Sequence, residues 1–231
     1  MKSDKTTLKF KNCTFQKNTY FDNSTVLKLE FSSVIFQGIT SFQSLNCLHL
    51  IKFTTSYFEK IGFFEGLNLG SENSIDTNTI RTIKGQLLKS ESKIGYLKYN
   101  ALEQRKHFQK LKIKDSDFYI LMLNSKSNDF GRNWFKGVKF TFKVSVFFFL
   151  MMIMVNSFVS AKYSLKFNLN DSFADTSKIL SEYLKFTFSL GFGSEEFQSN
   201  GYLYLIFIIA KIFIGYGIYQ TITAFRKYGK I

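Results

Sequence analysis

The sequence predicts a mixed fold: an amino-terminal right-handed parallel β-helix, a helical neck and two transmembrane α-helices. Three observations predict it. Phenylalanines recur at offsets of 21 and 22 residues between Leu8 and Leu69, a charged segment with heptad spacing follows, and two long apolar runs come last. We therefore expect a β-helix domain at residues 1–75, a helical neck or hairpin at 76–130 and a membrane domain at 131–231.

The phenylalanine pattern covers three successive units. Phe10, Phe15 and Phe21 recur as Phe31, Phe36 and Phe42, and again as Phe53, Phe58 and Phe64, while Leu27 and Leu29 recur as Leu48 and Leu50. A fixed period of this length is typical of stacked supersecondary units. Apolar residues two apart, with Asn, Ser, Thr and Gly between them, favour short strands joined by turns. A meandering antiparallel sheet is the alternative.

This spacing resembles that of pentapeptide-repeat proteins, in which an apolar residue occupies the central position of each repeat. The family's Ala-Asn/Asp-Leu core is missing here, and Phe takes its place between Leu8 and Leu69. The resemblance implies a β-helix with an internal phenylalanine core. It implies nothing about function.

The neck from Thr77 to Lys114 carries apolar residues at heptad spacing, with Lys, Glu and Arg between them. This pattern predicts one long amphipathic helix, with Asp76 or Thr77 as its N-cap. Two partners remain open for its apolar face. The helix either pairs with its counterpart in a homo-oligomer or folds against a shorter helix from Asp115 to Lys126.

The apolar runs are Phe140–Ala161 and Tyr202–Phe225, of 22 and 24 residues. At about 1.5 Å per residue they are long enough for a hydrocarbon core roughly 30 Å thick, so a lipid bilayer is the first expected partner. A pair of buried helices in a soluble protein is the alternative. Trp134 and Phe135 are expected at the level of the headgroups.

Basic residues precede the first run and follow the second, which places them at the same end of an antiparallel pair. Arg132, Lys136, Lys139 and Lys143 lead into the first run, and Arg226, Lys227 and Lys230 follow the second. The connection at residues 162–201 has four lysines against five acidic residues. The positive-inside rule then places both termini in the cytoplasm and the connection on the other side. The first ten residues, MKSDKTTLKF, contain no apolar signal-peptide region.

The tail GYGIYQTITAFRKYGKI and the segment SNDFGRNWFKGVKFT resemble parts of a group of bacterial membrane proteins that often carry pentapeptide-like repeats. This resemblance implies an architecture and a bacterial source, and we hypothesise a location in the bacterial inner membrane. It implies no reaction.

The connection contains a possible short helix from Ser177 to Phe188, followed by a Gly-x-Gly string. This order resembles the pore loop of two-helix potassium channels, although Ser replaces the family's Thr and Asp. Glycines would let successive carbonyl oxygens point at an ion. The resemblance assigns filter positions to Ser189, Leu190, Gly191, Phe192, Gly193 and Ser194, and a cation-attracting mouth to Glu195 and Glu196. An ordinary exposed loop is the alternative.

Lys211 lies near the middle of the second run. An ionisable residue at that depth snorkels, pairs with a partner or has a function. Its possible partners are Glu195, Glu196, a backbone carbonyl or water. The small residues Ala210, Gly217, Thr221 and Ala224 form a stripe that predicts a helix-packing face.

Catalytic and metal-binding motifs are missing from the sequence. His49, His107, Cys13 and Cys47 show no metal-ligand spacing, and neither a P-loop nor a Rossmann fingerprint occurs. We therefore expect no enzyme activity, no cofactor and no metal, and we expect both cysteines to be reduced thiols.

The leading functional hypothesis is a non-enzymatic, membrane-anchored interaction protein whose cytosolic β-helix binds a protein partner. The alternative is an oligomeric ion channel with residues 187–196 as its pore loop. The net charge of +14 also suggests a third hypothesis, a sensor of nucleic acid or lipid. Nucleic acid is disfavoured as a partner because no nucleic-acid-binding motif accompanies the charge.

Overall fold

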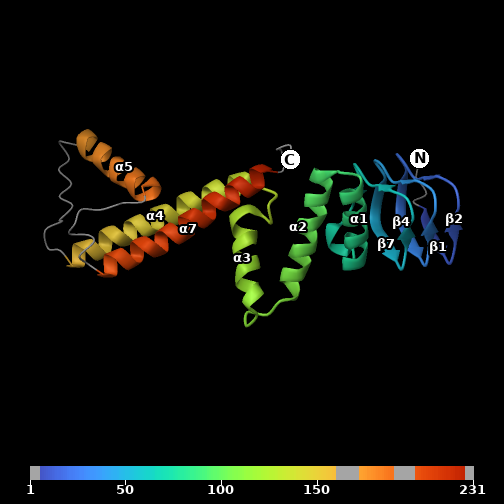
Figure 1. Ribbon diagram of the computed structural model, residues 1–231, viewed down its shortest axis with the longest axis horizontal. Helices are drawn as coiled ribbons and strands as arrows, with labels where there is room; N and C mark the ends of the chain where they lie inside the picture. Colours follow the sequence, from blue (N-terminus) through green and yellow to red (C-terminus); the bar gives the residue numbers. More distant parts are fainter. Residues whose placement is uncertain (1–5, 160–171, 190–200, 227–231) are drawn as a thin grey trace. The chain divides into compact units, whose positions relative to one another are not determined.

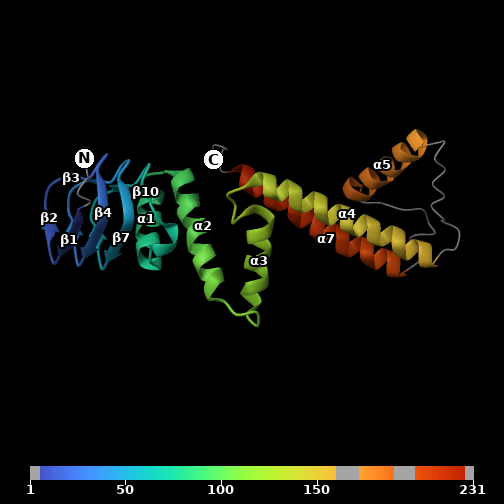
Figure 2. The same cartoon turned by 180° about the vertical axis from the view of Figure 1, so that it is seen from behind.

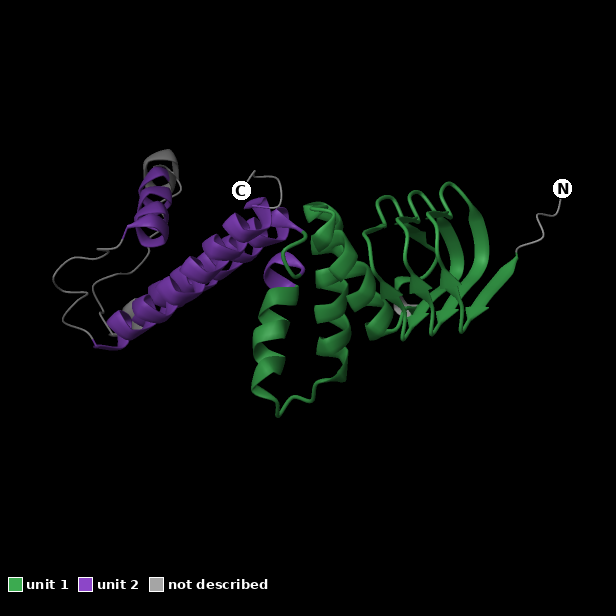
Figure 3. Cartoon of the chain, turned by 45° about the vertical axis from the view of Figure 1, so that its right-hand side comes forward, with its two compact units in different colours: residues 1–125, 130–132, 227–231 green, residues 126–129, 133–226 purple. Residues whose placement is uncertain are grey.

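The computed structural model describes residues 6–159, 172–189 and 201–226. Within these residues, ten short strands come first and six α-helices follow, so the mixed class predicted from the sequence is confirmed. Contacts divide the chain into two compact units, shown in green and purple in Figure 3. The first consists of residues 1–125, 130–132 and 227–231, and the second consists of residues 126–129 and 133–226.

The strands form three parallel sheets. The first contains β1 (Thr7–Lys11), β4 (Thr25–Ser32), β7 (Asn46–Thr54) and β10 (Asn68–Leu69); the second β2 (Thr14–Phe15), β5 (Ile35–Phe36) and β8 (Tyr57–Phe58); the third β3 (Thr19–Tyr20), β6 (Thr40–Ser41) and β9 (Gly62–Phe63). Consecutive strands belong to different sheets, so each circuit of the chain adds one strand to every sheet. We call such a circuit a layer (Figures 1 and 2).

The phenylalanines aligned by the sequence spacing lie one above another in three columns. The ring centroids are 5.2 and 5.1 Å apart along Phe10, Phe31 and Phe53; 5.3 and 4.6 Å apart along Phe15, Phe36 and Phe58; and 5.0 and 4.7 Å apart along Phe21, Phe42 and Phe64. Rings of neighbouring columns meet mostly edge to face, an arrangement that aromatic pairs prefer. These columns form most of the core of the strand region.

One predicted equivalence is wrong. Leu29 pairs with Ile51 and not with Leu50, because the register between β4 and β7 shifts by one residue between Val26 and Lys28. The extra residue lies in β7, which accounts for the change of offset from 21 to 22 residues.

The corners of each layer use left-handed backbone at matching positions. Asn12, Ser33 and Thr55 have φ values of 51°, 56° and 50°, and Asn23, Ser44 and Gly66 have values of 52°, 54° and 69°. Asn and Gly tolerate this conformation best, and the polar side chains of Ser and Thr suit exposed turns. The corners explain why small polar residues separate the apolar pairs in the sequence.

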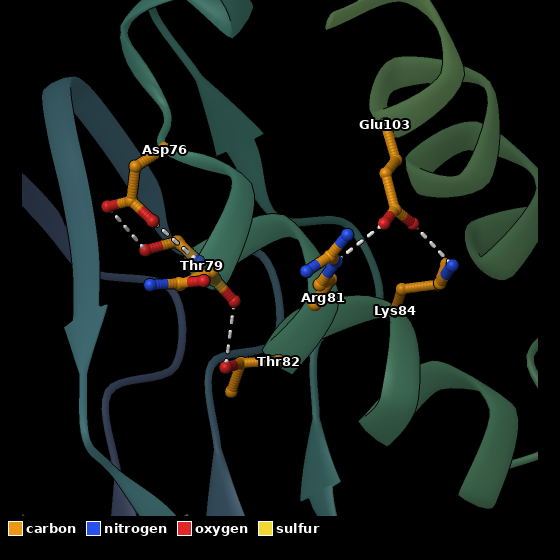
Figure 4. A network of polar contacts seen from close by, with 7 residues as sticks. Asp76, Thr79, Arg81, Thr82, Lys84 and Glu103 are labelled. Carbon is orange, nitrogen blue, oxygen red and sulfur yellow. Dashed lines mark hydrogen bonds and ion pairs between the residues drawn. The ribbon is translucent and has the colours of Figure 1, made fainter. Parts of the chain in front are cut away.

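Helix α1 (Thr77–Lys89) closes the carboxyl-terminal end of the stacked layers. Its Ile80, Ile83 and Leu87 are buried in the same core as the phenylalanines. Its polar side chains also serve strand backbone groups: Thr79 Oγ1 accepts from the N–H of Phe53 at 2.8 Å, and Gln86 Oε1 accepts from the N–H of Gly62 at 3.0 Å. The helix therefore takes the place of a further layer and covers the strand edges at β7 and β9. Asp76 is its N-cap, as predicted, and accepts from the N–H of Thr79 at 2.8 Å (Figure 4).

The single long helix predicted over residues 77–114 is wrong, because α1 ends and α2 (Lys93–Lys110) begins anew. Glu91 adopts a left-handed conformation with a φ of 58°. The N–H groups of Glu91 and Ser92 bond to carbonyl oxygens of the last turn of α1, at 3.2 and 2.9 Å. This is a Schellman termination, in which glycine usually holds the left-handed position. Here Glu91 holds the left-handed position in place of glycine, so the sequence carries no glycine signal for the end of α1 and the heptad spacing continues past it.

Helix α2 packs against α1. Tyr99, Ala101 and Leu102 are its buried residues, and Glu103 is held by Arg81 at 2.7 Å and by Lys84, both on α1 (Figure 4). A turn then leads into α3 (Ser116–Asn128), where the Phe118 ring lies 5.2 Å from that of Phe108 on α2.

The second unit contains α4 (Trp134–Val159), α5 (Ser172–Phe188) and α7 (Gly201–Phe225). Two segments, Trp134–Val155 and Gly201–Phe225, are long and apolar enough to cross a membrane. α4 begins before the predicted Phe140 because Asn133 Oδ1 accepts from the N–H of Lys136 at 3.2 Å and caps the helix. α4 and α7 run antiparallel, side by side (Figures 1 and 2), with Trp134 stacked on Phe225 at 4.8 Å.

Candidate functional site

The ammonium group of Lys211 on α7 lies against the carboxyl end of α5. Its Nζ donates to the carbonyl oxygens of Phe186 at 2.5 Å and Thr187 at 3.3 Å. The ring centroids of Phe186 and Phe207 lie 5.8 and 5.0 Å from the same nitrogen. Helix-terminal carbonyl oxygens and aromatic faces both carry partial negative charge, so this arrangement binds a cation. A backbone carbonyl is therefore one partner of Lys211.

Helix α5 is positioned by aromatic contacts with α4 and α7. The hydroxyl of Tyr183 lies 2.6 Å from Ser145 Oγ on α4, and its ring lies 5.5 Å from Phe149. Phe186 is fully buried and lies 5.6 Å from Phe149 and 6.1 Å from Phe207. These contacts hold the last turns of α5 against both long helices.

The contacts of α5 lie near the middle of both apolar segments. Ser145 is halfway along Trp134–Val155, and Lys211 is close to the midpoint of Gly201–Phe225. The outer face of α5 carries Leu180, Leu184 and Phe188, which are exposed to its surroundings. The last carbonyl oxygens of a helix lack partners within that helix, and Lys211 supplies hydrogen bonds to two of them here.

The predicted filter follows α5 in the sequence and is described only at its first residue. The N–H of Ser189 donates to the carbonyl oxygen of Lys185 at 2.9 Å, which continues α5 by one hydrogen bond. Leu190, Gly191, Phe192, Gly193, Ser194, Glu195 and Glu196 lie outside the described residues. The filter and the cation-attracting mouth stay predictions.

The predicted small-residue stripe lies on α7. Ala210, Gly217 and Ala224 are buried, and Thr221 is half-buried. A Cβ atom at Gly217 would overlap Thr141 of α4, and one at Gly137 of α4 would overlap Thr221. Each threonine donates to the carbonyl oxygen of the glycine four residues before it, at 2.9 Å. The two helices therefore approach closely through two reciprocal glycine–threonine contacts.

The α4 half of this contact and a nearby polar pair were not predicted from the sequence. Asn128 at the end of α3 donates to the side chain of Gln220 and, at 3.2 Å, to its carbonyl oxygen. Gln220 is a buried amide within an apolar run, which is the signal that would have pointed to it.

The stacked layers carry exposed apolar side chains. Ile35 and Tyr57 are paired across β5 and β8, with Tyr57 63% exposed. Ile39 and Ile61 follow four residues later in each layer, just before β6 and β9, and both are exposed. We call these four residues the exposed apolar face. All four remain exposed within the described chain.

The described residues contain no group of three or more His, Cys, Asp and Glu side chains that could hold a metal ion. His49 and His107 are exposed on β7 and α2. Cys13 and Cys47 are unpaired thiols, and burial raises the pKa of Cys47, which makes its reactive thiolate scarcer. The expected lack of enzyme activity stays a prediction.

No protein family, curated protein or solved structure matches this chain. The functional argument therefore rests on its own geometry.

Proposed function

We propose that this chain is a non-enzymatic, membrane-anchored interaction protein of the bacterial inner membrane. The observation that carries the proposal is the exposed apolar face of Ile35, Ile39, Tyr57 and Ile61. Exposed apolar side chains on neighbouring layers of one scaffold favour a protein partner, because contact removes them from water. α4 and α7 are the proposed anchor.

The stacked layers suit this role if they form a right-handed β-helix of the pentapeptide-repeat type. Support comes from the three parallel sheets, the three phenylalanine columns and the left-handed corners at matching positions. Stacked units of this kind present regular side surfaces whose residues vary without disturbing the core.

The proposed orientation places the stacked layers in the cytoplasm. Trp134 stacks on Phe225, so the start of α4 and the end of α7 adjoin. Arg132, Lys136 and Arg226 flank these ends, and the positive-inside rule assigns a basic end to the cytoplasmic side.

Site-specific photo-crosslinking in living cells tests the interaction. A photoreactive phenylalanine analogue replaces Tyr57 in the exposed apolar face, or Tyr20, which is equally exposed on β3 but outside it. We expect a discrete crosslinked product from position 57 and none from position 20. We also expect Ile35→Glu with Ile61→Glu to abolish the product without lowering the melting temperature.

An equal yield from positions 57 and 20, or a product that survives the glutamate substitutions, would contradict a specific partner at this face. Failure of the protein to fractionate with inner membranes would separately contradict the anchor.

A second candidate is the oligomeric ion channel, and one observation favours it. The carboxyl end of α5 points its carbonyl oxygens at a cation near the middle of the apolar segments. In a channel, the dipole of such a helix stabilises a permeating cation. Here Lys211 occupies the position itself.

Ion flux into liposomes containing the purified chain tests the channel. If the filter prediction holds, wild-type protein conducts cations and Gly191→Ala with Gly193→Ala abolishes conduction. Lack of flux from folded, inserted protein would exclude the channel and leave the interaction protein.

A further inference from the structure

Helix α3 carries apolar side chains that the described chain covers only in part. Residues 118–123 read FYILML, yet none of these six side chains is buried, and the buried residues of α3 are Ser127 and Asn128 at its end. Tyr119 and Ile120 are 50% and 59% exposed. A helix that is apolar on all sides is normally enclosed by protein or lipid. Phe118 contacts Phe108 of α2, whereas Tyr119 and Ile120 remain exposed and are available to a surface outside the described chain.

The turn before α3 displays lysines around an apolar tip. The N–H of Asp115 donates to the carbonyl oxygen of Lys112 at 2.9 Å, and Asp115 Oδ2 accepts from the N–H of Lys112 at 2.8 Å. This closed turn leaves Ile113 at its apex, 68% exposed, next to Lys114. Lys110, Lys112 and Lys114 are all exposed, and none forms an ion pair with another described residue.

We propose that α3 and the turn at residues 110–115 dock on the anionic headgroup region of the membrane. The proposal rests on the proposed membrane anchor. The three lysines bind lipid phosphates, while Ile113, Tyr119 and Ile120 enter the boundary between headgroups and acyl chains. Basic residues beside exposed apolar ones give both attractions that hold a peripheral helix at an anionic surface.

The length of chain between this turn and the membrane helix supports a lipid surface. α3 has 13 residues and spans about 20 Å, and residues 129–133 add at most about 18 Å before α4 begins. No membrane-crossing segment lies between the turn and α4, so both meet the same leaflet. That leaflet is the one beside Arg132 and Lys136, where a basic surface is expected.

Nucleic acid fits these residues less well. Phosphates of a duplex would attract the lysines, but Ile113, Tyr119 and Ile120 would stay in water. A lipid interface satisfies both kinds of side chain at once.

Fluorescence of the full chain in lipid nanodiscs tests the proposal. An environment-sensitive probe is attached to Ile120→Cys in a Cys13→Ser/Cys47→Ala background whose melting temperature matches that of the wild type. We expect blue-shifted emission, and quenching by spin-labelled lipid, in nanodiscs with 30% phosphatidylglycerol. In nanodiscs of phosphatidylcholine alone both effects should be weak.

Two triple variants distinguish the effect of the lysines in the turn from the effect of total charge. A lysine at an anionic surface contributes about fivefold to binding, so Lys110→Gln/Lys112→Gln/Lys114→Gln should weaken docking about a hundredfold and remove the quenching. Lys11→Gln/Lys17→Gln/Lys60→Gln removes the same charge from exposed positions of the stacked layers and should leave the quenching unchanged.

Water-like emission in anionic nanodiscs, equal quenching in both lipids or equal loss with both triple variants would overturn the proposal. A blue shift produced by duplex DNA without anionic lipid would assign the surface to nucleic acid instead. Protein that is not retained in nanodiscs would contradict the anchor, which is a separate outcome.

Discussion

At the scale of single residues, Glu103 joins α1 to α2. Partial burial by itself would raise the pKa of this carboxyl, but hydrogen bonds from Arg81 and Lys84, together with their charges, outweigh burial. The pKa of Glu103 therefore lies below its usual range in the folded protein. A carboxylate held in this way stabilises the fold only while it is ionised.

The expected result is a pH-dependent contribution to stability. Because the folded pKa of Glu103 lies below the unfolded one, the contribution is complete above an ordinary carboxyl pKa of about 4.3. It is lost as the pH falls through the folded pKa. Glu103→Gln should lower the melting temperature at pH 7 and lessen its decline between pH 6 and 3, as followed by circular dichroism in detergent. Glu91→Gln, an exposed control, should melt like the wild type.

Lys211 shows what sequence reasoning misses at this scale. Its depth marked it as unusual, and a backbone carbonyl was among its possible partners. Nothing in the sequence identified the carbonyl oxygens of Phe186 and Thr187, because every residue has a carbonyl and its orientation depends on where a helix ends. For the same reason, the contacts of Gly137 and Thr141 with α7 were not predicted, since their partners lie about 80 residues away in the sequence.

Lys211→Met should release the end of α5. The substitution keeps an unbranched side chain that is one atom shorter and removes the donors, and each carbonyl oxygen left without a partner costs about 1–3 kcal/mol. In lipid vesicles we expect Leu184→Cys to react slowly with a water-soluble maleimide when Lys211 is present and faster with Lys211→Met. Lys211→Arg should react slowly, because it keeps a cationic donor. Equal rates in all three would show that the contact does not hold α5.

At the scale of elements, the stacked layers were the most predictable part of the fold. A constant offset specifies which phenylalanines align, and alternation within each unit specifies which side chains point inward. The closing role of α1 could not be predicted in the same way. Thr79 and Gln86 bond strand N–H groups from about 25 residues away, and a side-chain acceptor of this kind leaves no periodic signal.

Alanine substitutions at Gly38 and Gly85 should change the stability of the stacked layers and α1 in opposite directions. A Cβ atom at Gly38 would overlap the backbone of Lys17 and Asn18 in the preceding layer, so Gly38→Ala should lower the melting temperature. Gly85 lies inside α1 with nothing within 4 Å of an added Cβ, so Gly85→Ala should stabilise the helix by about 0.5–1 kcal/mol. Thermal denaturation of both variants checks the pair, and a gain in stability from Gly38→Ala would show that the layers can separate there.

At the scale of the whole molecule, the two units have separate cores. Phe42 belongs to the core of the stacked layers, and Ile214 to the core formed by α4, α5 and α7. Units with separate cores can unfold in separate transitions. The three domains expected from the sequence, at residues 1–75, 76–130 and 131–231, stay a prediction.

Calorimetry in detergent should therefore resolve two transitions. Phe42→Ala removes a fully buried ring, at a cost of about 3–5 kcal/mol, and should lower only the transition of the stacked layers. Ile214→Ala should lower only the other. A single transition that both substitutions shift equally would mean that the two units unfold together.

The matching corners also bear on how such a protein evolves. Every layer begins and ends in the same backbone conformation, so an in-frame tandem duplication of residues 25–45 would join its neighbours without a new turn. Each duplication would lengthen the stack by one strand spacing, about 4.8 Å, and extend every phenylalanine column by one ring. A gene of this kind can change the reach of its product in fixed increments, through one recombination event at a time.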